Sequence, residues 1–254
     1  KRVGMVSSAL HVGRQAAGLM IEDLPAARQL AGIIRRDRPD VVHLGNGVRA
    51  NFDGILACLA TGTPAVCHVK GFETYGWREV WAGRRVRALI CMTRAILDHC
   101  RACGVEARDS RVVYDAVDEA WLRPRRSAAE LRSELGVPAG ATCLGLVGNI
   151  QEWKGQRFLV EAMAWLVDVE PEIRALLVGG IHRAGEDYAR EVRNLVEELG
   201  LSENVLFTGF REDVVDVMSA LDVVVHASVR PEPFGRVILE GMLLGKPVVA
   251  MAAG

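Results

Sequence analysis

Short apolar runs alternate with longer amphipathic segments along the whole chain, and this alternation predicts a parallel α/β fold. Runs bounded by turn residues indicate buried strands, whereas apolar residues three or four positions apart indicate helices. Because both halves show the pattern, we expect two Rossmann-like, doubly wound parallel-sheet domains. The expected strands cover residues 41–44, 65–69, 88–92, 111–114, 142–147, 175–178, 205–207, 222–226 and 248–251, and the expected helices cover 24–36, 51–60, 95–103, 128–135, 156–167, 188–199 and 214–220.

A polar segment rich in Pro and Arg separates the two halves. It begins near Asp118 and reaches Gly140, with one short helical stretch inside it. Such composition is typical of a connection between domains. We therefore expect an N-terminal domain at residues 1–122, a linker at 123–140 and a C-terminal domain at 141–254.

Composition limits the class of protein. Half of the 254 residues are hydrophobic, which is ample for two cores, and the formal net charge of −1 argues against nucleic acid as a partner. No apolar run is long enough to span a membrane and no signal peptide is visible, so a cytoplasmic protein is expected. Six cysteines fall mostly in apolar segments, as in a reducing compartment. The lone CxxC at Cys100–Cys103 has no second pair, which argues against zinc.

The stretch from Glu232 to Glu240 carries the strongest chemical signal. Glu232 stands just before a predicted helix, whose free amides attract anions such as phosphate. Glu240 lies within that helix among apolar residues, where an ionised carboxylate needs a strong partner. A separation on the order of 10 Å is wide for two glycosidase carboxylates but suits a pair that holds opposite ends of an elongated ligand. The alternative is that both are ordinary surface residues.

A second candidate is the loop at residues 148–155, which follows an expected strand and precedes a helix. Loops of this kind lie at the carboxyl end of the sheet, where α/β proteins bind ligands. Lys154 could meet a diphosphate as a point charge, and Gly148 and Gly155 permit close approach of backbone. A surface lysine in a helix-entry turn is the alternative.

Three weaker signals follow other strands. The turn at Gly209-Phe210 ends the strand at 205–207, and an ordinary turn explains it equally well. Gly179-Gly180 lacks the full GxGxxG spacing of a dinucleotide fingerprint. In the first half, His68 and Lys70 end a buried strand and lie two residues apart, so both could face the same side. A structural histidine is the alternative there.

The segment EPFGRVILEGM, with seven residues between Glu232 and Glu240 and with GKPVVA following, closely resembles the signature of family 4 retaining glycosyltransferases (glycosyl transferases group 1). The resemblance implies the GT-B architecture, in which two Rossmann-like domains face each other across a cleft. It also implies a nucleotide-activated sugar as donor, UDP- or GDP-linked. A glycan, lipid-linked or small-molecule acceptor would bind to the first domain. Against the family pattern both domains lack their outer elements, so we expect the chain to be a fragment.

The resemblance assigns roles to individual residues. Glu232 and Lys154 would be catalytic, the first at the donor sugar near the reacting carbon and the second at the diphosphate. Glu240 would hold the ribose hydroxyls. Asn149 stands where many members carry arginine, and Lys70 stands where the family often has histidine. Further donor-binding positions would be Phe234, Gly235, Gly148, Asn149, Gly209 and Phe210, and the acceptor-side positions would be His68 and Lys70.

The expected activity is therefore retaining transfer of a hexosyl group without a metal or another cofactor. Peripheral contact with the inner membrane face could accompany a lipid-linked acceptor. Two alternatives stay open: a sugar-nucleotide epimerase of similar architecture, and a catalytically inactive nucleotide-sugar-binding module. Turnover of a sugar nucleotide separates enzyme from module, and the configuration of the product at C2 separates transferase from epimerase.

Overall fold

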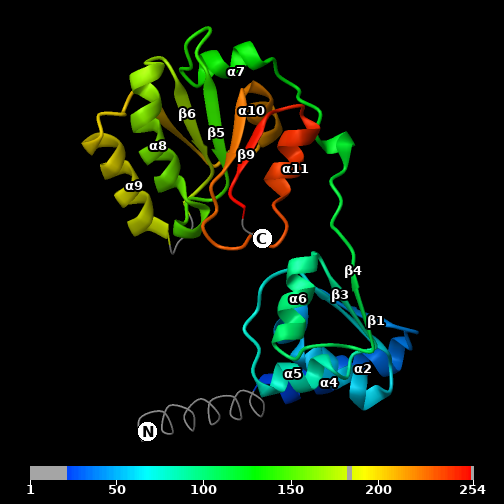
Figure 1. Ribbon diagram of the computed structural model, residues 1–254. Helices are drawn as coiled ribbons and strands as arrows, with labels where there is room; N and C mark the ends of the chain where they lie inside the picture. Colours follow the sequence, from blue (N-terminus) through cyan, green and yellow to red (C-terminus); the bar gives the residue numbers. More distant parts are fainter. Residues whose placement is uncertain (1–21, 182–184, 253–254) are drawn as a thin grey trace, which may run out of the picture. The chain divides into compact units, whose positions relative to one another are not determined.

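The computed structural model describes residues 22–181 and 185–252. Within these residues the chain forms two parallel β-sheets, each with its own helices (Figure 1). The chain divides into two compact units between Asp115 and Ala116. Both sheets are parallel throughout the described residues. The prediction of two Rossmann-like α/β domains is confirmed.

The first unit holds a four-stranded sheet in the order β1-β2-β3-β4. In β2, Ala65, Cys67 and Val69 are almost completely buried, whereas the two residues between them are half-buried. This alternation follows from the period of a strand, which turns every second side chain to the same face. The elements are α2 (Leu24–Asp37), β1 (Val42–Leu44), α3 (Gly47–Ala50), α4 (Phe52–Thr61), β2 (Ala65–Val69), α5 (Trp77–Gly83), β3 (Ala88–Cys91), α6 (Arg94–Ala102) and β4 (Asp109–Val112).

The first unit differs from the sequence expectation in its last strand and in two short helices. The last strand starts at Asp109, two residues earlier than expected, because Asp109–Val112 pairs with the whole of β3. Val113 and Tyr114, which the apolar pattern assigned to the strand, are exposed. The short helices α3 and α5 are not among the elements predicted from the sequence. The start of α5 is fixed by Glu79, whose Oε2 accepts from the amide of Gly76 at 2.8 Å.

The second unit holds a five-stranded sheet in the order β7-β6-β5-β8-β9. The strands β6 and β7 lie on one side of β5, and the later strands β8 and β9 lie on its other side. The switch point of the sheet therefore lies between β5 and β8. The elements are α7 (Ala128–Glu134), β5 (Cys143–Val147), α8 (Gln156–Val169), β6 (Arg174–Val178), α9 (Glu186–Glu198), β7 (Val205–Gly209), α10 (Val214–Ala220), β8 (Val223–His226), α11 (Arg236–Leu243) and β9 (Val248–Ala250), with short 3-10 turns at Glu119–Trp121 and Glu152–Lys154.

Both faces of this sheet are covered, as a doubly wound fold requires. One core joins the strands to α8 and α9 through residues such as Leu159 and Val192. The other joins them to α7 and α10 through residues such as Leu131 and Met218. In Figure 1 α8 and α9 lie on one side of the strands, and α10 and α11 lie on the other. The central strand β5 is consequently buried over nearly its whole length.

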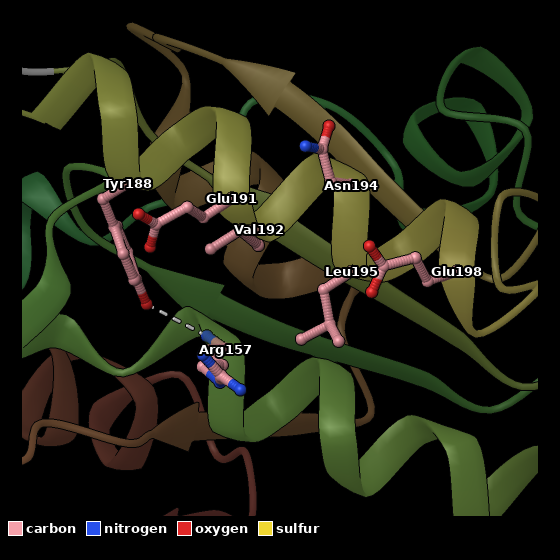
Figure 2. A pocket seen from close by; sticks show the side chains of 7 residues that line it. All are labelled: Arg157, Tyr188, Glu191, Val192, Asn194, Leu195 and Glu198. Atoms are coloured by element: carbon pink, nitrogen blue, oxygen red, sulfur yellow. Dashed lines mark hydrogen bonds between the residues drawn. The ribbon is translucent and has the colours of Figure 1, made fainter.

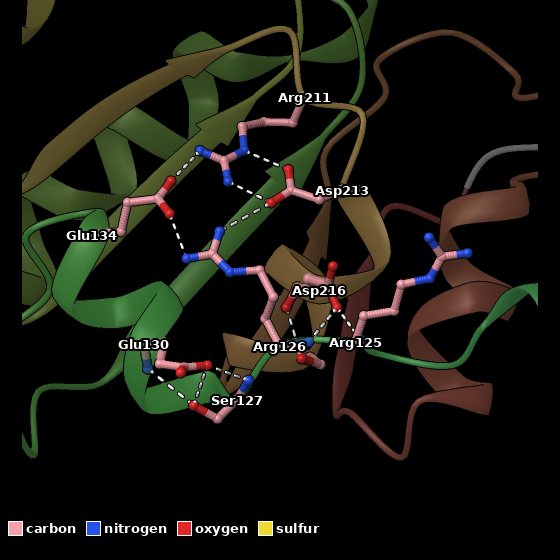
Figure 3. A network of polar contacts seen from close by, with 9 residues as sticks. Arg125, Arg126, Ser127, Glu130, Glu134, Arg211, Asp213 and Asp216 are labelled. Atoms are coloured by element: carbon pink, nitrogen blue, oxygen red, sulfur yellow. Dashed lines mark hydrogen bonds and ion pairs between the residues drawn. The ribbon is translucent and has the colours of Figure 1, made fainter.

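The segment at 123–140, expected to be a linker, packs on the second unit. Leu131 and Val137 belong to its core. Asp216 of α10, itself buried, accepts hydrogen bonds from the backbone amides of Arg125 at 2.5 Å and Arg126 at 3.1 Å (Figure 3). The connection between the units therefore comes earlier in the chain than the composition indicated.

Candidate functional site

Two loops meet at the switch point of the second sheet, one after β5 and one after β8. The amide of Val229 donates to the carbonyl of Trp153 at 2.9 Å, which ties the loops together. Gly155 has φ +72° and packs directly on the carbonyl of Ala227, so a side chain at this position would collide with backbone. Ligands of open α/β sheets bind at the carboxyl ends of the strands where the strand order reverses. The site predicted from the sequence has this location.

Lys154 and Glu232 form an ion pair between these loops. Lys154 Nζ lies 2.9 Å from Glu232 Oε2, and the side chains are only 16% and 15% exposed. The two residues are 78 positions apart in the sequence, so the strand order brings them together. Lys154 Nζ also lies 4.1 Å from the centre of the Trp153 ring. The two residues assigned to catalysis therefore share one small site.

Two further donors reach the same carboxylate oxygen. Ser228 Oγ donates to Glu232 Oε2 at 2.9 Å, and His226 Nε2 lies 3.2 Å from it. Burial alone would raise the pKa of Glu232, but the hydrogen bonds from His226, Lys154 and Ser228 and the charge of Lys154 outweigh it and lower the pKa to about 2. Glu232 is thus ionised at neutral pH. His226 and Ser228 are not among the residues predicted from the sequence, although both are polar and lie at or just after the end of a buried strand.

Asn149 lies in the same loop as Lys154 and brings no charge. Its carbonyl accepts from Gln156 Nε2 at 3.0 Å, and Gln156 is completely buried. Gly179, at φ +153°, lies directly against the Gly148 carbonyl, so the loops after β5 and β6 touch through glycine. Gln156 and the two glycines therefore fix the backbone on which Lys154 stands.

The helix α11 begins four residues after Glu232. Gly235 caps it with φ +75°, and Phe234 before it is half-buried. Glu240 lies inside the helix, where its Oε1 is 3.2 Å from Arg236 Nη2. The side chain of Glu240 is 17% exposed and that of Arg236 is 66% exposed, so the partner reaches in from solvent. The expected helix start between the two glutamates is confirmed.

The remaining predicted residues lie elsewhere. Gly209 ends β7 and Phe210 follows it; β6 separates β7 from β5, and Phe210 is 75% exposed. His68 and Lys70 belong to the first unit. His68 stacks on His43 with ring centres 5.7 Å apart, and its Nε2 has no hydrogen-bond partner. Burial lowers the pKa of His68, and the charge of Lys70 adds to this effect.

Two hollows lie beside α9. One, of about 190 Å³, lies between α8 and α9, where the hydroxyl of Tyr188 accepts from the Arg157 amide at 3.1 Å (Figure 2). The other, of about 590 Å³, adjoins the switch-point loops through Trp153 and Arg230. Neither contains the Lys154–Glu232 pair in its lining. Their walls are mostly exposed side chains, which favour solvent over a specific ligand.

The described ranges contain neither a membrane-spanning helix nor a candidate metal site. No helix there is long and apolar enough to cross a membrane. No group of three or more His, Cys, Asp or Glu residues in residues 22–181 and 185–252 is arranged to hold a metal ion. The expectation that the reaction needs no metal stays a prediction.

The two parallel-sheet units, with a paired cation and carboxylate at the switch point of the second, define a two-domain Rossmann-like protein of the GT-B class. Residues 127–254 match the family described as Glycosyl transferases group 1, and residues 11–121 match the family described as Glycosyltransferase Family 4. The chain belongs to this glycosyltransferase family. The resemblance inferred from the Glu232–Glu240 segment is confirmed.

Relatives and solved structures agree with this assignment. The 2-deoxystreptamine glucosyltransferase of Streptomyces kanamyceticus is 36% identical over 182 residues, which are 69% of this chain and 45% of the relative. The D-inositol 3-phosphate glycosyltransferase of Corynebacterium urealyticum is 38% identical over 133 residues, 51% of this chain and 31% of the relative. The chain thus spans less than half the length of either curated relative.

Among solved structures, Anabaena HepE in complex with UDP has a TM-score of 0.82 and 31% identity, covering 91% of this chain and 64% of that chain. HepE in complex with UDP-glucose has a TM-score of 0.78 at the same identity, covering 90% of this chain and 63% of that chain. A glycosyltransferase from Rickettsia africae also has a TM-score of 0.82, but its 22% identity supports the fold alone.

Proposed function

We propose that this chain is the donor- and acceptor-binding part of a retaining glycosyltransferase that uses a UDP-sugar. The observation that carries the proposal is the contact between Lys154 and Glu232, 2.9 Å long, at the switch point of the second sheet. Sugar transfer requires a cation for the leaving diphosphate and an acceptor for the hydroxyl groups of the sugar. This site offers both side by side, largely shielded from solvent.

Lys154 would bind the diphosphate of the donor. A cation in a partly dry site stabilises the charge that develops on the leaving group far more than it would in water. Asn149 adds no charge, so the remaining attraction would come from the amides at the N-terminus of α11. The HepE structures, at 31% identity, contain UDP and UDP-glucose, which supports uridine as the nucleoside of the donor.

Glu232 would accept hydrogen bonds from the donor sugar. Its low pKa makes it a poor proton donor at neutral pH, which argues against a role as general acid. Glu240 would hold the ribose, exchanging its exposed partner Arg236 for hydroxyl groups. Gly148, Phe234 and Gly235 would shape the wall beside the diphosphate and sugar, and Gly209 and Phe210 would lie at the base. With no second carboxylate beside Glu232 among the described side chains, retention would come from attack on the face from which the diphosphate departs.

The acceptor would bind to the first unit. His68 lies near the end of β2 and Lys70 follows the strand, and the buried Nε2 of His68 has no hydrogen-bond partner. Such groups can hold a hydroxyl or an anionic substituent of a glycan, a lipid-linked sugar or a small molecule.

A nucleotide-sugar-binding module without catalysis is the second candidate. The neutral Asn149 favours it, because the family resemblance implies an arginine at this position in many members, and among the described residues Lys154 is the cation in contact with Glu232. Such a module would bind UDP-sugars and leave them intact.

One experiment distinguishes these candidate functions. The protein that contains this chain is screened for thermal stabilisation by UDP-, GDP- and ADP-sugars, since a ligand that binds the native state raises its melting temperature. The best donor, in labelled form, is then followed for transfer and hydrolysis, with the product anomer read by NMR. A retained anomer supports the proposal, binding without turnover supports the module, and an inverted C2 centre indicates an epimerase. Stabilisation by none of these sugar nucleotides would refute a donor site.

A further inference from the structure

A network of largely buried hydrogen-bond donors holds the carboxylate of Glu232. Three donors converge on Oε2, namely Lys154 Nζ at 2.9 Å, Ser228 Oγ at 2.9 Å and His226 Nε2 at 3.2 Å. No hydrogen bond reaches Oε1 from any residue that the structure describes. A carboxylate so bound cannot rotate freely, because rotation would break all three contacts at once.

We propose that His226, with Ser228, is a positioning residue that fixes the carboxylate of Glu232 and leaves Oε1 as its only oxygen open to a ligand. The proposal rests on the proposed function, in which that ligand is the donor sugar. His226 itself touches neither sugar nor diphosphate. It acts through Glu232.

Burial selects one form of the histidine ring. His226 is 6% exposed, and its Nδ1 is buried without a hydrogen-bond partner. A proton on Nδ1 would be a buried donor without an acceptor, which is costly. A proton on Nε2, in contrast, points at Glu232 Oε2 and at Ser228 Oγ, both 3.2 Å away. The neutral ring with its proton on Nε2 satisfies these contacts.

Ser228 completes the arrangement. It is 1% exposed, and its single proton is used towards Glu232, so its oxygen can accept from His226. The end of β8 holds His226 in place, and Ser228 lies two residues beyond it. His226 pairs with Ala250 of β9, and its carbonyl accepts from the amide of Met251 at 3.0 Å.

Lys154 alone could not both orient Glu232 and bind the diphosphate, and the network assigns the first of these tasks to His226 and Ser228. A diphosphate at the site would draw Lys154 away from Glu232, because a diphosphate carries more negative charge than a single carboxylate. His226 and Ser228 are buried and both face Glu232, so the diphosphate does not compete for them. They would keep Glu232 oriented while Lys154 turns to the leaving group.

Two matched substitutions test this role. In glutamine the amide nitrogen is separated from Cα by the same number of bonds as Nε2 of histidine, so His226→Gln retains a donor towards Glu232. In asparagine the amide is one bond shorter and corresponds to Nδ1, where the structure has no partner. Both are buried neutral amides, and thermal unfolding shows whether each variant folds. Ser228→Ala removes the second donor at a position outside β8.

Affinities for UDP and for UDP-glucose are measured by calorimetry, together with kcat/KM for the donor. We expect His226→Asn and Ser228→Ala to weaken UDP-glucose binding and kcat/KM by about tenfold, a typical loss for one hydrogen bond to a charged group. Affinity for UDP should stay within about twofold, because the nucleotide does not touch Glu232. His226→Gln should recover most of the loss.

Equal behaviour of folded His226→Asn and wild type, or equal damage by Gln and Asn, would overturn the proposal. A loss of UDP affinity as large as that of UDP-glucose would show a purely structural effect. If wild type binds UDP-glucose but transfers nothing, the proposed function fails, and the ratio of the two affinities still decides the positioning role. If wild type binds neither ligand, both proposals fail.

Discussion

Replacing Glu232 by Gln tests whether the carboxylate at the switch point is ionised and bound as the structure shows. The substitution keeps the shape of the side chain and removes its charge. Burial raises the pKa of Glu232, but the donors His226, Lys154 and Ser228 together lower it from 4.5 to about 2. The folded protein therefore holds an ionised carboxylate more tightly than the unfolded chain does.

The sign and size of the effect follow from proton linkage. Between about pH 2 and pH 4.5 the unfolded chain binds more protons at this residue, so the stability contributed by Glu232 rises with pH. The contribution is complete above the unfolded pKa and is lost as pH falls through the folded one. The lowered pKa corresponds to on the order of 3 kcal/mol, of which about 1.4 kcal/mol is lost by about pH 3.5.

The assay is urea unfolding of wild type and Glu232→Gln at several pH values from about 3.5 to 7. Other acidic groups titrate in both proteins, so the difference in unfolding free energy isolates Glu232. We expect this difference to change by about 1.4 kcal/mol between neutral pH and the acidic end. Lys154→Met is the matched control, since removing one donor should raise the pKa of Glu232 and shrink the change. A difference that is constant over the whole range would refute the reasoning.

Three further predictions concern the same unit. Lys154→Ala should weaken UDP binding by at least about tenfold and uridine binding little, measured by calorimetry, and equal losses would contradict a diphosphate contact. Gly155→Ala should lower the urea-unfolding free energy by about 2 kcal/mol more than Gly200→Ala, because both have positive φ but only Gly155 faces a backbone carbonyl. Asp216→Ala should lower the urea-unfolding free energy by about 1–3 kcal/mol, because the backbone amides at positions 125 and 126 lose their acceptor (Figure 3). Asp216→Asn should cost less, because its side-chain oxygen can still accept, and equal costs would argue against that acceptor.

The sheets could be predicted from the sequence because their strands are buried on both sides. In β5 nearly every residue is apolar, and turn residues mark both ends, so the pattern leaves little room for another structure. The strand β4 shows the opposite case. Asp109 and Ser110 are polar, and only pairing with β3 makes them part of a strand. Pairing between distant segments is not visible in a local pattern.

Some residues of the site could likewise be predicted from local sequence signals, and others could not. Lys154 and Glu232 were found separately, each from its own loop, because a cation beside glycine and a carboxylate before a helix are local signals. Their contact depends on β8 lying next to β5, which follows from the order of the strands. His226 and Ser228 were missed because a polar residue at the end of a buried strand is common. Their importance appears only when three donors meet at one oxygen.

The geometry of the pair depends on packing well away from it. Gly145 of β5 pairs with Val224 of β8, and the side chain of Leu221 fills the space that a Cβ at Gly145 would occupy. Leu221 is buried in the core that covers this face of the sheet. Because interiors are close-packed, a larger residue at Gly145 would move β8 relative to β5. The loops after both strands carry the ion pair, so a shift of the strands would separate Lys154 from Glu232. A glycine in the core therefore belongs to the requirements of the site, although it touches none of the charged groups.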